Sequence, residues 1–144
     1  MKIYICSVCG YISFNEAPDN CPVCHAPKDK FSQNDNIFKE SSEKSPEAEV
    51  KHIPSVQVVK TCGLIKEENC TDIIVRIGET LHPMEEKHYI TFIDCYVNEI
   101  FAARMELTPQ ANPAAVFHLK AESGKVTIVE KCNIHGYWMK DSNI

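Results

Sequence analysis

The chain has 144 residues, a net charge of −5 and a hydrophobic content of 44%. This length predicts one medium domain, or a small domain joined to a medium one, with enough apolar residues for a core. The negative charge argues against nucleic acid or an anionic membrane as the main partner. No apolar run approaches membrane-spanning length, and the first residues do not form a secretory signal, so we expect a cytoplasmic protein without a membrane partner.

Residues 1–38 carry two Cys-x-x-Cys pairs, Cys6 with Cys9 and Cys21 with Cys24. In a chain without a secretory segment this spacing favours metal ligation over disulfide bonds. Four thiolates in a tetrahedron bind zinc or iron. Because the segment has few apolar residues, we expect the metal to supply its folding free energy.

The sequence around these pairs resembles rubredoxin, and most closely the rubredoxin-like domain of rubrerythrins, through C-x-x-C-G-Y, C-P-x-C and A-P-K-D-x-F. The resemblance implies one iron held by the four cysteines, cycling between ferrous and ferric forms in electron transfer. A structural zinc ribbon is the alternative, because four thiolates bind either metal. His25 would be a fifth ligand, and we expect it to be simply exposed.

Residues 39–50 are charged, rich in serine and contain a proline. This composition predicts a solvated linker between the first domain and a second domain over residues 51–144.

The second domain contains runs of β-branched and aromatic residues separated by Gly, Pro and Asn turn signals. No helical period is apparent. About seven short strands in this length predict an antiparallel β-sandwich, and hence an all-β protein. The runs are Val56–Val59, Ile73–Ile77, Tyr89–Val97, Ile100–Leu107, Ala115–Leu119 and Lys125–Val129.

Histidines and one cysteine indicate a second metal site in this domain. His82 and His88 are six residues apart, which does not fit the four-residue spacing of a helical zinc motif. Pro83 favours an extended backbone or a turn at His82. Cys132 and His135 form a Cys-x-x-His, and His52 lies in K-H-I-P. Imidazole together with thiolate suits iron, copper or zinc, so we expect a site borne on loops and strand ends.

We expect no metal-binding role for the remaining cysteines and histidine of this domain or for its Met105. Cys62, Cys70 and Cys95 lack ligand spacing and are expected to be isolated core or surface thiols. His118, in the middle of a run, is expected to be a surface or hydrogen-bonded histidine. Met105 is expected in the core.

Three motifs, K-H-I-P, H-P-M-E-E-K-H-Y-I and C-N-I-H-G-Y-W, resemble superoxide reductase, the catalytic domain of desulfoferrodoxins and neelaredoxins. The resemblance implies an immunoglobulin-like β-sandwich holding one mononuclear iron, with an open position where superoxide is reduced to hydrogen peroxide. Lys51 matches the family's lysine beside the first histidine and would attract superoxide. The implied ligands are four equatorial histidines and an axial thiolate: His52, His82, His88, His135 and Cys132.

Two positions depart from the family. The family often has Glu-Lys-His where this chain has Val50, Lys51 and His52. Glu49 is displaced by one residue, which on an extended backbone reverses the side-chain direction, so we expect it not to be a sixth ligand. The first domain has C-P-V-C where desulfoferrodoxins have adjacent cysteines, and is therefore a rubredoxin-type module.

Three functions are compatible with these patterns. The first is a superoxide reductase that receives electrons from a reduced rubredoxin or another reductase, with the first iron centre as a relay. The second is a non-catalytic iron electron carrier, and the third is a zinc-ribbon interaction module on an immunoglobulin-like domain. The resemblance favours the first function and implies a homodimer.

Overall fold

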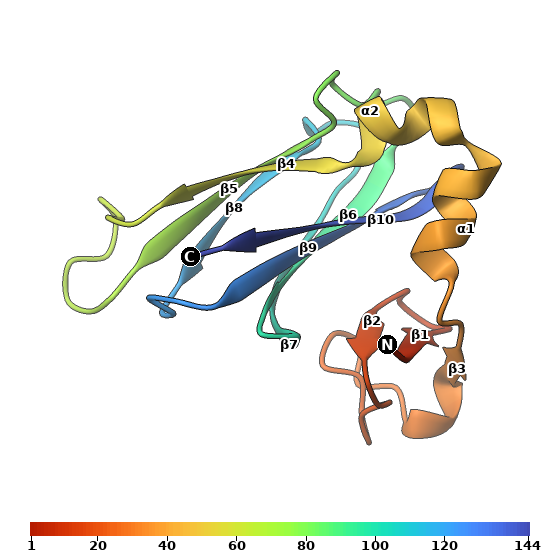
Figure 1. Ribbon diagram of the computed structural model, residues 1–144, viewed down its shortest axis with the longest axis horizontal. Coiled ribbons are helices and arrows are strands. Elements are labelled where there is room, and N and C mark those ends of the chain that lie inside the picture. The colour runs from red at the N-terminus through yellow and green to blue at the C-terminus, as the bar shows by residue number, and fades with distance from the viewer.

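The computed structural model describes residues 1–144 and contains a small N-terminal unit, a helical connection and a β-sandwich (Figure 1). The small unit has a three-stranded sheet with the order β2-β1-β3. Its strands are β1 (Ile3–Cys6), β2 (Ile12–Phe14) and β3 (Phe31–Gln33), the last preceded by a 3-10 turn (Lys28–Lys30).

Helices occupy the segment that composition predicts as a solvated linker. They are α1 (Ile37–Lys44), a 3-10 turn (Pro46–Ala48) and α2 (Glu49–His52). In α1, Ser41 is buried, and its hydroxyl accepts a hydrogen bond of 3.1 Å from the Tyr137 amide on the sandwich. The helix is therefore fixed by tertiary contacts that its polar sequence does not reveal. No helix has both the length and the apolar character needed to cross a bilayer.

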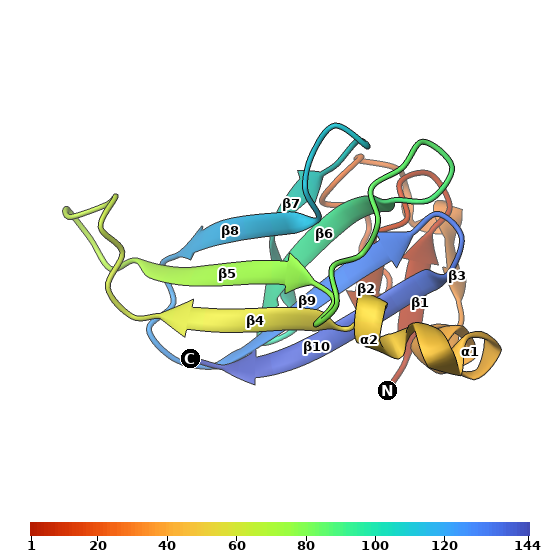
Figure 2. The same cartoon turned by 90° about the horizontal axis from the view of Figure 1, so that it is seen from above.

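The sandwich consists of two antiparallel sheets, with the orders β10-β9-β6-β7 and β4-β5-β8 (Figure 2). Each of the six predicted runs lies largely within a strand, which confirms the all-β fold. A seventh strand, β10, follows the Cys-x-x-His motif. The strands are β4 (Pro54–Val59), β5 (Thr71–Ile77), β6 (Ile90–Val97), β7 (Ile100–Glu106), β8 (Ala114–Leu119), β9 (Lys125–Cys132) and β10 (Gly136–Asn143).

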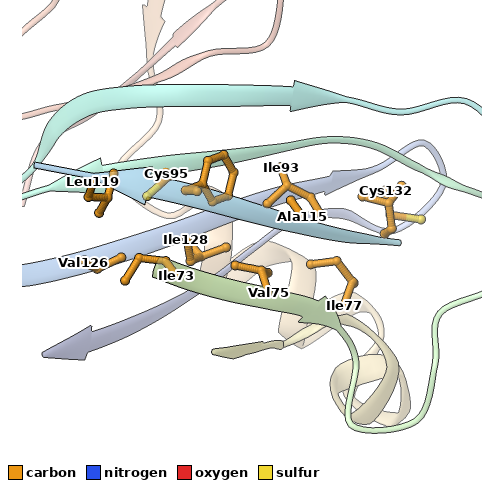
Figure 3. Close-up of a cluster of buried hydrophobic side chains, with 12 residues drawn as sticks. Ile73, Val75, Ile77, Ile93, Cys95, Ala115, Leu119, Val126, Ile128 and Cys132 are labelled. Carbon is orange, nitrogen blue, oxygen red and sulfur yellow. The ribbon is translucent and has the colours of Figure 1, made fainter. Parts of the chain in front are cut away.

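One hydrophobic core fills the space between the two sheets (Figure 3). On β5, Ile73, Val75 and Ile77 are buried and alternate with more exposed residues, as expected for a strand with one face in the core. Cys95 is fully buried in this core, as predicted. Met105 is 42% exposed, so its predicted place in the core is wrong; β7 is an edge strand, where one side lacks a neighbour.

The small unit covers the outer face of the four-stranded sheet, so that β6 is buried on both faces. Tyr96 has no exposed surface, and its ring stacks on Tyr11 at 6.0 Å and meets Phe14 edge-on at 5.1 Å. Tyr11 and Phe14 thus pack with Phe92 and Tyr96 of β6 in a second core shared by both units. Rings in such offset and edge-on pairs add attraction beyond the area they bury.

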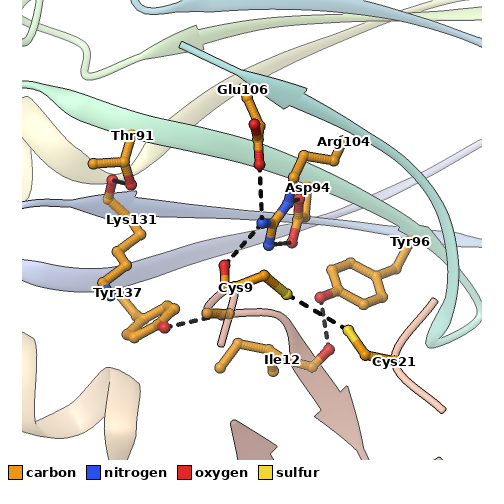
Figure 4. Close-up of polar contacts among 11 residues, drawn as sticks. Cys9, Ile12, Cys21, Thr91, Asp94, Tyr96, Arg104, Glu106, Lys131 and Tyr137 are labelled. Carbon is orange, nitrogen blue, oxygen red and sulfur yellow. Dashed lines mark hydrogen bonds and ion pairs between the residues drawn. The ribbon is translucent and has the colours of Figure 1, made fainter. Parts of the chain in front are cut away.

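Polar contacts fix the orientation of the small unit (Figure 4). The Arg104 guanidinium donates two hydrogen bonds, of 2.6 and 2.8 Å, to the buried Asp94 carboxylate and a third, of 2.9 Å, to the Cys9 carbonyl. The Tyr137 hydroxyl donates to the Gly10 carbonyl at 2.9 Å. Gly10 has φ of +79°, and a Cβ there would lie 3.0 Å from the Tyr137 hydroxyl, so both conformation and space favour glycine.

Candidate metal centres

The four cysteines of the small unit gather into one cysteine cluster, as their spacing predicts. The Sγ atoms of Cys6 and Cys24 are 3.6 Å apart, and those of Cys9 and Cys21 are 3.5 Å apart. A tetrahedral ion with metal–sulfur bonds of about 2.3 Å would separate its ligand atoms by about 3.8 Å. All eight cysteines of the chain are free thiols, and the spacing of these four fits a single metal ion.

The backbone builds this cluster from two equivalent loops. In the first, the Cys6 amide donates to the Tyr11 carbonyl, and the Gly10 amide donates to the Cys6 carbonyl, both at 2.9 Å. The second loop repeats the pattern with Cys21 and His25 at the first and fifth positions. His25 therefore stands where the first loop has a glycine. It adopts φ of +66° and is exposed, as expected.

The histidines and cysteine predicted for the second site also come together, in what we call the histidine cluster. His52 ends α2, His82 and His88 lie in the loop between β5 and β6, Cys132 ends β9, and His135 lies in the turn before β10. Ligand atoms of four of them, all except His82, lie within 4.8 Å of one another. His82 joins them because its Nε2 atom is 3.1 Å from Nε2 of His52.

The four imidazole rings are arranged as a square. Adjacent ring centroids are 4.5 to 5.0 Å apart, with interplanar angles of 69° to 86°. The His52 and His88 rings face each other across the square at 6.3 Å and 28°. His52 and His82 are each 1% exposed, whereas His88 and His135 are partly exposed, so the square opens toward solvent on one side.

Hydrogen bonds fix the protonation of the two buried rings. Nδ1 of His52 lies 2.9 Å from the Ala48 carbonyl, and Nδ1 of His82 lies 2.6 Å from the Pro83 carbonyl. A carbonyl only accepts, so both Nδ1 atoms carry the proton. Burial lowers the pKa of each ring to about 4, and both are therefore neutral near pH 7.

Two unprotonated Nε2 atoms therefore face each other at 3.1 Å, an arrangement that repels unless a cation lies between the lone pairs. Nε2 of His88 is also buried without a hydrogen-bond partner. Donor atoms that lack partners and converge in this way fit a bound metal ion. Carbonyl oxygens that hold the far ring nitrogen are the usual way of orienting histidine ligands.

The Cys132 thiol approaches the square from the protein interior. Cys132 is 1% exposed and packs in the core between the sheets, with Sγ 3.9 Å from Nδ1 of His135. Burial raises the pKa of this thiol, and the backbone amides of His135 and Ile134 oppose that rise. The turn therefore presents amide protons to the sulfur. Because the sulfur lies on the core side and His88 and His135 are partly exposed, the square is accessible to a small molecule only from the solvent side.

Trp138, which sequence reasoning did not assign to the site, supports two of the rings. Its indole packs on His52 at 4.9 Å, and Nε1 donates to the His135 carbonyl at 3.1 Å. A tryptophan three residues after a candidate ligand is a weak signal by itself. Only the folded arrangement gives it this supporting position.

Lys51 is exposed on α2 beside the histidine cluster, and its charge contributes to lowering the pKa of His52 and His88. The loop after β5 packs against this helix through Gly78, whose φ is +83° and whose Cβ would lie 2.6 Å from the Lys51 carbonyl. The same Cβ would lie still closer to the Thr80 carbonyl oxygen, so a side chain there would have to displace the loop, the helix or both.

Residues Glu49–His52 are helical. The backbone at Glu49 is therefore not extended, and the one-residue displacement does not reverse the direction of its side chain. Helical spacing places Glu49 and His52 on neighbouring positions of one face. Glu49 nevertheless is not among the gathered ligand atoms; it is exposed and lines a surface groove with Glu79 and Lys140.

His118 is exposed and hydrogen-bonded to Asp72, as predicted, but Cys62 and Cys70 are not the isolated thiols that the sequence predicted. These three residues belong to a third group, which we call the hairpin cluster. Together with Asp72 they place four ligand atoms within 4.8 Å of one another. Because Cys62 and His118 are 56 residues apart, no local motif in the sequence indicates this group. Only the closing of the β4–β5 hairpin and the pairing of β5 with β8 bring its members together.

Known proteins match both parts of the chain, which confirms the resemblances expected from the motifs. Residues 43–141 match the family described as Desulfoferrodoxin, and residues 4–32 match the family described as Rubrerythrin, rubredoxin-like domain. A desulfoferrodoxin from Syntrophotalea carbinolica is 30% identical over 143 residues, covering 98% of this chain and 96% of that protein. A desulfoferrodoxin homolog from Methanothermobacter thermautotrophicus is 32% identical over 139 residues, covering 95% of each.

A solved structure has the same fold over the larger part of the chain. A variant of superoxide reductase (neelaredoxin) from Ignicoccus hospitalis superposes with a TM-score of 0.59 at 25% identity, covering 70% of this chain and 85% of that chain. The sandwich that carries the histidine cluster therefore has a known structural relative.

Proposed function

Because the chain belongs to the desulfoferrodoxin family, we propose that it is a superoxide reductase, which reduces superoxide by one electron to hydrogen peroxide. The observation that carries this proposal is the square of four imidazoles with a thiol on its core side and solvent access on the other. The histidine cluster would hold iron, which would supply the electron for the reduction.

The residues around this iron prepare the site for a small anion. Burial lowers the pKa of His52 and His82 more than the Ala48 and Pro83 carbonyls raise it, so these two imidazoles are neutral. The carbonyls hold the proton on Nδ1 and leave Nε2 free to bind the metal. The Cys132 thiolate supplies the single negative ligand, and the turn amides of Ile134 and His135 moderate it. Lys51 adds a positive charge at the solvent side, which raises the encounter rate with superoxide.

The cysteine cluster would hold a second iron that relays electrons to the first. Support for this role comes from the contact between the units. The Tyr137 hydroxyl donates to the Gly10 carbonyl at 2.9 Å, Gly10 directly follows Cys9, and Tyr137 lies two residues after His135. A buried route therefore joins the two clusters within one chain.

Electrons would reach the cysteine cluster from a reduced rubredoxin or another reductase, because each superoxide consumes one. A reducing compartment such as the cytoplasm suits a chain whose eight cysteines are free thiols. We expect a homodimer, which sedimentation at several protein concentrations tests.

Mixing the reduced protein with superoxide in a stopped-flow instrument tests the function. We expect superoxide to disappear and hydrogen peroxide to form without evolution of dioxygen. Dioxygen evolution would instead indicate a dismutase, and no consumption would indicate a non-catalytic electron carrier. A Cys132→Ser variant should lose the absorption band of an iron-bound thiolate, and retention of that band would reject Cys132 as a ligand.

The role of Lys51 is tested in the same assay. Lys51→Met should lower the second-order rate constant about tenfold and weaken its dependence on ionic strength. Lys120→Met removes the same charge at the residue after β8, distant from the histidine cluster, and should leave the rate constant unchanged. Equal effects of the two substitutions would show that only net charge matters.

A further inference from the structure

The hairpin cluster lies at the end of the sandwich opposite α2, where the loop between β4 and β5 projects (Figure 2). The Cys62 amide donates to the Cys70 carbonyl at 3.2 Å, which closes the loop. Asp72 and His118 are directly paired across β5 and β8. From Asp72 to Ile77, near the histidine cluster, β5 spans about 17 Å, so the hairpin cluster is separate from both sites described above.

Four potential ligand atoms converge on one point of this surface. Nδ1 of His118 lies 3.5 Å from Sγ of Cys62 and 3.9 Å from Sγ of Cys70. The same nitrogen is 2.6 Å from Oδ1 of Asp72, which in turn is 3.7 Å from Sγ of Cys70. Two sulfurs, one nitrogen and one oxygen thus share a space that would hold one ion.

These separations match a tetrahedral zinc site. Zinc bonds of about 2.0 to 2.3 Å place ligand atoms about 3.3 to 3.8 Å apart. Three of these four separations fall close to this range. The fourth, between Asp72 and His118, is a hydrogen bond whose proton leaves when both atoms bind a cation, and it then has to lengthen by about 0.7 Å.

We propose that the hairpin cluster is a third metal site, which binds zinc. Two thiolates with one imidazole and one carboxylate favour zinc over the hard cations calcium and magnesium, which take oxygen ligands. The Leu64 amide, 3.4 Å from Sγ of Cys62, provides the kind of backbone hydrogen bond that stabilises a ligand thiolate. Zinc bound here would join the loop to β5 and β8.

The accessibility of the cluster suits exchange with free metal. The side chain of His118 is 34% exposed and that of Asp72 is 18% exposed, while Cys70 is only 9% exposed. An ion can therefore enter from solvent and be held on its inner side by a buried sulfur. Charge also favours a cation, because three of the four ligands are anionic when deprotonated.

The experiment uses the full chain with both iron sites loaded and its thiols kept reduced. Zinc chloride is added, excess zinc is removed with a competing chelator, and iron and zinc are measured in the same sample. We expect two irons and one retained zinc per chain. X-ray absorption at the zinc edge should show two sulfur neighbours at about 2.3 Å, with nitrogen and oxygen neighbours at about 2.0 to 2.2 Å.

Variants assign the retained zinc to this cluster. Cys62→Ser and His118→Gln, at partly exposed positions that should tolerate substitution, should each weaken zinc binding at least tenfold while iron stays at two. Cys95→Ala and His25→Gln remove a thiol and an imidazole elsewhere and should retain one zinc. The proposal is overturned if no zinc is retained, if zinc is retained only at the expense of iron, or if the Cys62 and His118 variants hold it as tightly as the unmodified chain.

Discussion

The cysteine cluster and the histidine cluster are built in opposite ways. All ligands of the cysteine cluster lie between Cys6 and Cys24, in two loops with the same hydrogen bonds. Ligands of the histidine cluster range from His52 to His135, and the sandwich core holds them in place. We infer that the metal folds the small unit, whereas the sandwich folds first and then receives its metal. The predictions below test this contrast, from the largest expected effect to the smallest.

The largest effect should follow Cys21→Ser, which removes a fully buried ligand of the cysteine cluster. Structural metal sites of this kind contribute roughly 10–16 kcal/mol to folding, so the small unit should unfold and iron should fall from two per chain to one. Superoxide reduction by the chemically reduced protein should persist. Iron analysis with amide NMR spectra checks both results. Cys62→Ser removes a thiol outside the small unit and should keep two irons.

Unfolding of the sandwich together with the small unit would contradict the inference that the sandwich folds independently of the metal in the cysteine cluster. In that outcome the shared aromatic core, rather than the metal, would be the main source of stability for both units.

A smaller effect should follow Arg104→Met, which leaves the Asp94 carboxylate buried without its partner. Breaking a buried ion pair in this way costs about 3–5 kcal/mol, and the Cys9 carbonyl loses its donor as well. Urea unfolding measures the loss. Lys120→Met breaks an exposed pair with Glu68 and should cost less than about 1 kcal/mol. Similar losses for both variants would mean that the Arg104 contacts do not fix the small unit.

Tyr96→Phe should have a more moderate effect. The hydroxyl of this buried residue donates to the Ile12 carbonyl at 2.7 Å, and its removal leaves that carbonyl unpaired at a cost of about 1–3 kcal/mol. Thermal unfolding of the small unit, monitored through the release of its iron, checks this loss of stability. Tyr4→Phe is the matched control, because the Tyr4 hydroxyl forms no hydrogen bond within the protein and its loss should be nearly neutral.

The smallest effect should follow Glu49→Ala. Glu49 is exposed and is not among the gathered ligand atoms, so the free energy of unfolding should change by no more than about 0.5 kcal/mol. The superoxide rate constant should stay within about twofold of the original value. A collapse of the rate or of the oxidised spectrum would show that this carboxylate reaches the metal after all, and that the histidine cluster is completed by a local residue.

Much of the fold is determined by the sequence itself. The alternation of buried Ile73, Val75 and Ile77 is a property of one strand, and it appears in the chain as a repeat of two. The paired cysteines of the small unit are equally local, because each loop needs only its own few residues. The histidine cluster is predicted differently: its residues are far apart, and ligand chemistry together with the family motifs, rather than any periodicity, identifies them.

Only the tertiary structure decided which surfaces and side chains from distant elements meet. The polar helix α1 is held against the sandwich by the hydrogen bond from the Tyr137 amide to Ser41. Strand β6 is buried on both faces because the small unit covers Tyr96. The hairpin cluster exists because strand register places His118 beside a cysteine 56 residues earlier. A pattern along the chain reports the periodicity of one element, whereas such contacts depend on how separate elements pack and pair.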